Sequence, residues 1–182
     1  MKNVTLIVSA QLLMLSAMNT SFADLEVVDR VDLERYEGRW YEIARLPNRF
    51  QRQCVSDVSA EYRLRDDGRV AVINRCRRED GSYAEASGVA RLSDPDRPQG
   101  ALEVRFAPSW LSFLPFVWGD YRILALGSDY DHALIGSDNR RYLWVLSRAV
   151  EMDGALLEQL LERAREQGFD TEDLIPTRHE DH

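Results

Sequence analysis

The sequence predicts an all-β protein: an eight-stranded antiparallel up-and-down β-barrel with one C-terminal α-helix packed on its outside. Short alternating apolar segments follow one another from Gly38 to Ser147, separated by turn sequences such as Asp66-Asp67-Gly68. A Gly-x-Trp sequence opens this series at Gly38 and Trp40, and Arg148 follows its last segment. We expect the guanidinium of Arg148 to stack on the indole of Trp40, which requires the sheet to close on itself.

Strand positions follow from alternation and from the turn residues. In the first hairpin Val58, Ala60, Tyr62 and Leu64 share one face, and the residues between them are mostly polar. One face therefore suits an interior and the other mostly suits water. The expected strands are Gly38–Arg45, Val58–Leu64, Arg69–Cys76, Ala84–Leu92, Ala101–Phe106, Asp120–Leu126, His132–Gly136 and Arg141–Ser147.

One helix is expected after the last strand. Asp153 is its predicted N-cap and Gly168 its predicted C-cap. Residues 169–176 should add a short closing segment, and residues 177–182 are predicted to fray. The helix carries an apolar stripe that should face the barrel, made of Leu156, Leu157, Leu160, Leu161 and Ala164.

The first residues are typical of a secretory signal peptide. Met1-Lys2-Asn3 is positively charged, residues 4–18 are mostly apolar, and small residues surround Ala23. We expect cleavage after Ala23, which leaves residues 24–182 as a single domain. The apolar run is shorter than the ~18–20 residues that a membrane span needs.

Composition excludes several classes of function. The net charge is −8, and a chain this acidic is a poor partner for nucleic acid. Lys2 is the only lysine, so the chain without its signal peptide has no lysine for a Schiff base or a P-loop. The histidines lack the spacing of metal ligands and no catalytic base is evident, so we predict no metal, no cofactor and no enzymatic activity; these histidines are His132, His179 and His182.

Cys54 and Cys76 are the only cysteines, and an exported protein would pair them. The register of the first hairpin places Cys76 opposite Val58 rather than Cys54. A disulfide therefore requires a bulge, or a turn away from the sheet, near Ser56-Asp57.

Three motifs, in this order, resemble the signatures of the lipocalin family. Gly38-Arg39-Trp40-Tyr41-Glu42-Ile43-Ala44-Arg45 is similar to the first signature, and Leu143-Trp144-Val145-Leu146-Ser147-Arg148 to the third. Gly119-Asp120-Tyr121 resembles the second, with glycine where threonine is common. The resemblance covers nearly the whole chain after the signal peptide, and it is strongest to the bacterial lipocalins (Blc) and apolipoprotein D.

This resemblance implies a small apolar ligand inside the barrel, and the bacterial branch is associated with fatty acids and lysophospholipids. We expect a periplasmic lipid-binding or transport protein. The alternatives are a carrier of another apolar ligand, such as an isoprenoid or a tetrapyrrole, and a lipocalin-fold enzyme that acts on a lipid-like substrate. Many bacterial lipocalins are lipid-anchored, but no cysteine lies near Ala23. We therefore predict a soluble periplasmic or secreted protein without a lipid anchor.

Residues with inward parity are the candidate ligand contacts. Tyr62, Asn74 and Trp144 resemble pocket residues of apolipoprotein D. A buried amide needs a partner, so Asn74 should bond either to the barrel wall or a water, or to a lipid headgroup or carboxylate. Gly38, Trp40 and Arg148 are interpreted as structural residues that close the barrel, with direct ligand contact as the alternative. The predicted apolar wall is Ala60, Val72, Val104, Phe106 and Ile135.

Residues 110–118 combine four aromatic residues with a proline and lack alternation. They connect the fifth and sixth strands, at the same end as the loop after the first strand. Two interpretations remain open: ordinary packing over the barrel rim, or an exposed apolar lip that meets a membrane or a second copy of the chain. The aromatic residues of this lip are Trp110, Phe113, Phe116 and Trp118.

Overall fold

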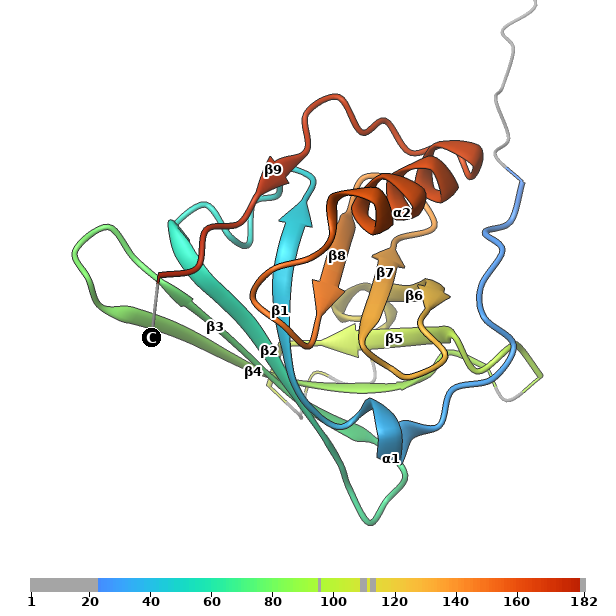
Figure 1. The fold of residues 1–182 in the computed structure, drawn as a ribbon. Helices are drawn as coiled ribbons and strands as arrows, with labels where there is room; N and C mark the ends of the chain where they lie inside the picture. The colour runs from blue at the N-terminus through green and yellow to red at the C-terminus, as the bar shows by residue number, and fades with distance from the viewer. Residues whose placement is uncertain (1–22, 95, 109–110, 112–113, 181–182) are drawn as a thin grey trace, which may run out of the picture.

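The structure is a computed structural model that describes residues 23–94, 96–108, 111 and 114–180. Its eight long strands form a closed barrel, because each strand pairs antiparallel with the next and β1 also pairs with β8 (Figure 1). The predicted fold class is confirmed. The strands are β1 Gly38–Arg45, β2 Ser56–Leu64, β3 Val70–Arg77, β4 Tyr83–Leu92, β5 Ala101–Arg105, β6 Gly119–Leu126, β7 His132–Gly136 and β8 Leu143–Ser147.

The predicted signal peptide lies outside the described residues, apart from Ala23. A short helix that was not predicted, α1 (Leu33–Tyr36), precedes the barrel and lies at the end where β1 begins (Figure 1). The Asp32 carboxylate caps it by accepting from the backbone N–H groups of Glu34 and Arg35. Four residues are too few to show helical periodicity in a sequence.

The predicted contact between Arg148 and Trp40, which joins the start of β1 to the residue after β8 at the closed end of the barrel, is confirmed. The guanidinium carbon of Arg148 lies 4.1 Å from the centre of the Trp40 ring. Arg148 also donates to the backbone carbonyls of Arg39 and Glu37, at 2.8 and 2.7 Å. Gly38 has φ 93°, and a Cβ there would lie 3.3 Å from an Arg148 nitrogen, so glycine meets both requirements.

Helix α2 (Gly154–Glu166) packs against the outside of the barrel, as predicted (Figure 1). Its buried face is Leu160, Leu161 and Ala164, which meet the outward side chains of β6, β7 and β8. Asp153 is the N-cap, as predicted. The C-cap is Gln167 rather than Gly168, which follows it with φ 86° in the left-handed conformation that glycine favours.

Residues 169–176 add a short closing segment, as predicted, whereas residues 177–180 are held against the barrel and do not fray; residues 181 and 182 lie outside the described chain. Strand β9 (Ile175–Pro176) pairs with Ala44 and Arg45 at the end of β1, where β2 has already separated from that strand. The backbone N–H of Thr177 then donates to Ile43, and the Arg178 carbonyl accepts from Asp57. Backbone pairing therefore holds this segment against the barrel, although its side chains follow no apolar pattern.

The disulfide between Cys54 and Cys76 is confirmed, and so is the irregularity that it requires. The pairing of β2 with β3 shifts register between Ser56 and Ser59, and Asp57 has φ 53°. This bulge lets the chain before β2 turn back, so that Cys54 reaches Cys76 with a Cα–Cα distance of 5.4 Å.

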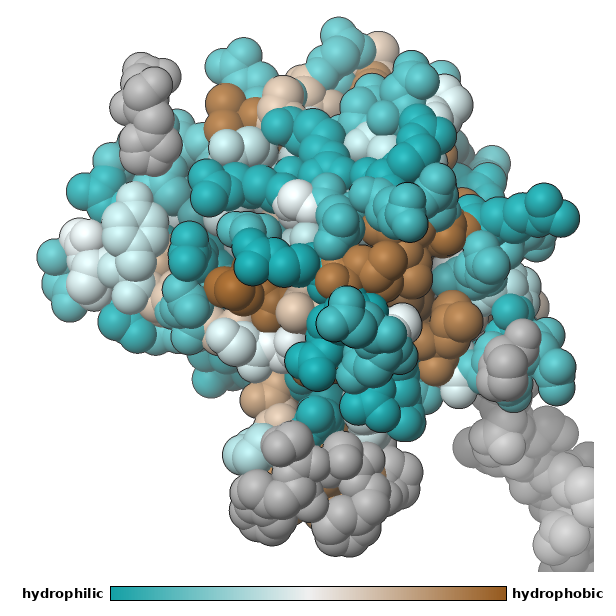
Figure 2. Space-filling model, turned by 90° about the horizontal axis from the view of Figure 1, so that it is seen from below, coloured by the Kyte–Doolittle hydropathy of each residue, from teal (hydrophilic) through white to brown (hydrophobic). Residues whose placement is uncertain are grey.

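The surface is mostly hydrophilic, as the high content of charged residues suggests. Seen from below, it shows separate apolar patches framed by hydrophilic side chains (Figure 2). Within the described part of the chain, no helix is long and apolar enough to cross a membrane.

Candidate ligand-binding cavity

The barrel encloses a cavity of about 700 Å³. Phe50 and Gln51, from the loop between β1 and β2, line it together with Phe116 and Trp118, from the segment between β5 and β6. These loops lie at the opposite end from α1 and surround the mouth of the cavity. The sequence predicted that both loops lie at the same end of the barrel. Cavities of this size accept one small organic ligand.

Seven of the eight predicted contact residues line this cavity. The exception is Val72, which is buried in the apolar cluster inside the barrel but is not part of the cavity wall. The Val72 side chain points into the barrel, as predicted. Alternation shows which face a side chain is on, but it does not show how far along the barrel axis the side chain lies. The seven that line the cavity are Ala60, Tyr62, Asn74, Val104, Phe106, Ile135 and Trp144.

Asn74 presents an unpaired amide to the cavity. It lies between Ala60 on β2 and Ala86 on β4, and all three residues line the wall. Among the described residues, none forms a hydrogen bond with its side chain. Within the described chain the barrel wall therefore supplies no partner for this amide, which leaves a water or a bound ligand as its partner.

A polar network that the sequence did not predict lies near the mouth. The Trp144 indole N–H donates to Gln51 Oε1 at 2.8 Å, and Gln51 Nε2 donates to Glu42 at 2.5 Å. Glu42 is buried, and Arg45 neutralises it at 2.7 Å; Thr177, after β9, also donates to Glu42. The predicted contact Trp144 is therefore held in place by the loop before β2.

Inward parity could have identified Glu42, which is two residues from Trp40 on β1. Gln51 could not be found in this way, because it lies in an irregular loop. The network ties that loop to β1, β8 and the C-terminal segment.

A cluster of three hydrogen-bonded tyrosines lies at the floor of the cavity, and two of them line it. Tyr62 on β2 and Tyr121 on β6 line the cavity, and Tyr36 of α1 lies next to them, stacked on Trp40 with 4.8 Å between ring centres. The Tyr121 hydroxyl lies 2.8 Å from the Tyr62 hydroxyl and 2.8 Å from the Tyr36 hydroxyl. Burial raises the pKa of Tyr62 to about 12, and it also raises the pKa of Tyr36 and Tyr121.

The structure describes only two of the four aromatic residues of the predicted apolar lip. Trp110 and Phe113 lie outside the described residues. Phe116 is 80% exposed, whereas Trp118 is half-buried between two arginines, with the guanidinium carbon of Arg91 3.8 Å and that of Arg105 5.2 Å from its ring centre. Two further aromatic side chains at the mouth are exposed, Phe50 at 56% and Phe106 at 43%.

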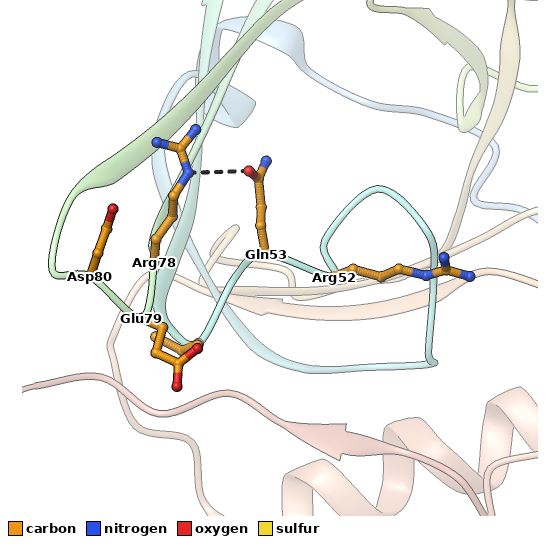
Figure 3. Close-up of a pocket in the computed structure, with 6 residues that line it drawn as sticks. Arg52, Gln53, Arg78, Glu79 and Asp80 are labelled. Carbon is orange, nitrogen blue, oxygen red and sulfur yellow. Dashed lines mark hydrogen bonds between the residues drawn. The ribbon is translucent and has the colours of Figure 1, made fainter.

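A second depression, of about 540 Å³, lies on the surface beside the disulfide (Figure 3). Arg78 and Gln53 point toward one another across it, with Arg78 Nε donating to Gln53 Oε1 at 3.1 Å, while the Arg52 side chain extends away (Figure 3). Its walls are mostly charged or polar, and we assign no ligand to it. No group of metal-ligating side chains occurs among the described residues.

The fold and the cavity define a class of protein: an up-and-down barrel that encloses a small apolar ligand. The chain matches the lipocalin-like domain over residues 31–179, and it belongs to the lipocalin family, whose members are generally binding proteins rather than enzymes. The resemblance seen in the three motifs is confirmed.

Named relatives and solved structures agree with this assignment. Temperature-induced lipocalin-1 of Arabidopsis thaliana is 41% identical over 163 residues, which cover 89% of this chain and 87% of the relative. Outer membrane lipoprotein Blc of Escherichia coli K12 is 40% identical over 151 residues, or 82% and 80% of the two chains. Insecticyanin from the tobacco hornworm Manduca sexta has the same fold, with a TM-score of 0.66 at 20% identity over 87% of this chain and 86% of its own.

Proposed function

We propose that this lipocalin holds a fatty acid or a lysophospholipid in its barrel and carries it through the periplasm or outside the cell, without covalent chemistry. The observation that carries the proposal is the cavity of about 700 Å³ with largely apolar walls and one open end. Each buried CH₂ group of an acyl chain contributes ~0.8 kcal/mol before ordering costs. The relatives named Blc, about 40% identical, support a lipid as the ligand.

Export is part of the same proposal. A signal peptide that ends at Ala23 would leave residues 24–182 as one lipocalin domain. The Cys54–Cys76 disulfide supports an oxidising compartment, since cytosolic thiols are kept reduced.

We further propose that cargo passes through the mouth at a lipid surface. Phe50, Phe106 and Phe116, here called the mouth aromatics, are exposed and also line the cavity. A ligand that leaves the barrel must pass these rings. If the mouth contacts a bilayer, the acyl chain can move between the cavity and the lipid without exposure to water. A second copy of the chain on this surface is the alternative.

The test of ligand binding is a titration with oleic acid and with lysophosphatidylcholine, paired with a variant that fills the cavity. Val104→Trp places an indole on the inward face of β5 and should weaken both ligands at least tenfold. Glu103→Trp is the matched control, because it lies next to Val104 but on the outer face, where it loses only a partly exposed ion pair with Arg91. Equal affinity of both variants would contradict a site inside the barrel.

Native mass spectrometry of protein purified from its own host separates the alternatives. A bound isoprenoid or tetrapyrrole would replace the lipid proposal. Lysophosphatidylcholine that returns with a changed mass after incubation would show that the protein is an enzyme, since a carrier returns its ligand unchanged.

A further inference from the structure

The floor of the cavity carries one more hydrogen-bond donor than it uses. Each tyrosine hydroxyl has one proton to donate and two lone pairs that accept. The hydroxyls of Tyr36, Tyr62 and Tyr121 form two hydrogen bonds with one another, which use two of their three protons. Among the described residues these three hydroxyls have no other hydrogen-bond partner, so one proton is left over.

The direction of the two bonds decides which hydroxyl holds the third proton. If Tyr121 accepts from both neighbours, its own proton is free; if it donates to Tyr62, the Tyr62 proton is free. Both of these rings line the cavity. Only when Tyr121 donates to Tyr36 does the free proton lie on the ring outside the cavity wall. A bound acceptor would select one of the first two arrangements, and a hydroxyl can rotate to provide it.

The surroundings of the floor favour an acceptor oxygen over a donor. The raised pKa values keep all three hydroxyls protonated at neutral pH, so they remain donors. Arg148 lies behind Trp40 and hydrogen-bonds to backbone carbonyls, and within the described chain no carboxylate forms an ion pair with it. Its positive charge therefore adds to the attraction that an oxygen acceptor would feel at the floor.

We propose that the tyrosine floor binds the oxygen-bearing end of the ligand, so that a carbonyl or carboxyl oxygen enters first and the apolar chain extends toward the mouth. This inference rests on the proposed function, because it assumes a lipid-like ligand inside the barrel. It favours ligands whose polar end is compact, such as a fatty acid, an ester or a ketone. A phosphate headgroup is bulkier, and we expect it to stay at the mouth.

A thermodynamic cycle tests the inference with ligands of one chain length. The affinities of 2-dodecanone and dodecane are measured for the native protein and for Tyr62→Phe/Tyr121→Phe by displacement of 1-aminoanthracene fluorescence. The variant lacks the hydroxyls of Tyr62 and Tyr121, which line the cavity, but it keeps both aromatic rings. We expect 2-dodecanone to bind the variant about tenfold more weakly and dodecane to bind both proteins alike. An equal change for the two ligands would overturn the inference.

Dodecanoic acid, titrated in parallel, identifies the source of the oxygen. If the variant weakens it as much as it weakens 2-dodecanone, the floor accepts carboxyl groups as well as neutral carbonyls; if only 2-dodecanone is weakened, the floor selects a neutral carbonyl. Tyr41→Phe is the matched control, because Tyr41 lies on the outside of the barrel against His179. It should change none of these affinities.

A measurement on the native protein keeps the inference testable if the double variant does not fold. The carbonyl stretch of bound 2-dodecanone should lie at lower wavenumber than that of the same ketone in hydrocarbon solvent. An unshifted stretch would overturn the inference while leaving the proposed function intact. Failure of the native protein to bind any of the three ligands, dodecane included, would instead contradict the proposed function.

Discussion

At the scale of single residues, Trp40 does most to close the barrel. It is fully buried, its indole N–H donates to the Tyr36 carbonyl at 2.9 Å, and Arg148 covers its ring. We predict that Trp40→Ala lowers the free energy of unfolding by ~3–5 kcal/mol, as other large aromatic deletions in cores do. Urea denaturation of the native protein and the variant measures this difference. An unchanged free energy of unfolding combined with lost ligand binding would show that Trp40 is a ligand contact instead.

Single residues also show how far a sequence pattern can locate a site. Alternation assigned the inward face of β2 correctly, because a period of two fixes which side chains point into a barrel. It could not show that Val72 lies away from the cavity wall, since depth depends on how the other strands fill the interior. It also missed Tyr36 and Gln51, which reach the floor and the mouth from a single helical turn and from a loop, where no period exists.

At the scale of elements, the disulfide fixes the loop before β2 to the β3 strand. Breaking it in Cys54→Ala/Cys76→Ala should lower the free energy of unfolding by about 3 kcal/mol, because the bridge closes a segment with a sequence separation of 22. Thermal unfolding of the two proteins measures the loss. Gln51 lies on the same loop, so the variant should also bind oleic acid more weakly. Alkylation of the native protein without reductant should leave its mass unchanged, because a disulfide has no free thiol. A gain in mass would contradict the pairing.

The elements predicted best were those with a long pattern or a strong turn signal. Strands β1 and β7 have the predicted bounds, and the bulge in β2 followed from the positions of the two cysteines. Strand β9 is only two residues long, so its pairing depends on where β2 separates from β1 and leaves backbone groups free. These unpaired backbone groups of β1 arise from the way the barrel closes, and no local pattern in the C-terminal segment indicates them.

At the scale of the whole molecule, the barrel has one closed and one open end, and the mouth aromatics mark the open one. We predict that the protein binds phosphatidylcholine vesicles through this end. Phe50→Ser/Phe116→Ser should reduce the bound fraction in a flotation assay at least tenfold, because burying each phenyl ring in the lipid interface contributes ~1.5–3 kcal/mol. Zwitterionic vesicles without net charge are used because the chain has a net charge of −8.

The control for this prediction is Val150→Ser, which removes an apolar side chain that is 46% exposed and follows β8 at the closed end. It should leave vesicle binding unchanged, because the closed end would face away from the bilayer. Equal binding by all three proteins would contradict docking through the mouth. A molecular mass that rises with protein concentration in sedimentation, and that returns to the monomer in the double variant, would show that the mouth aromatics meet a second copy of the chain and not a membrane.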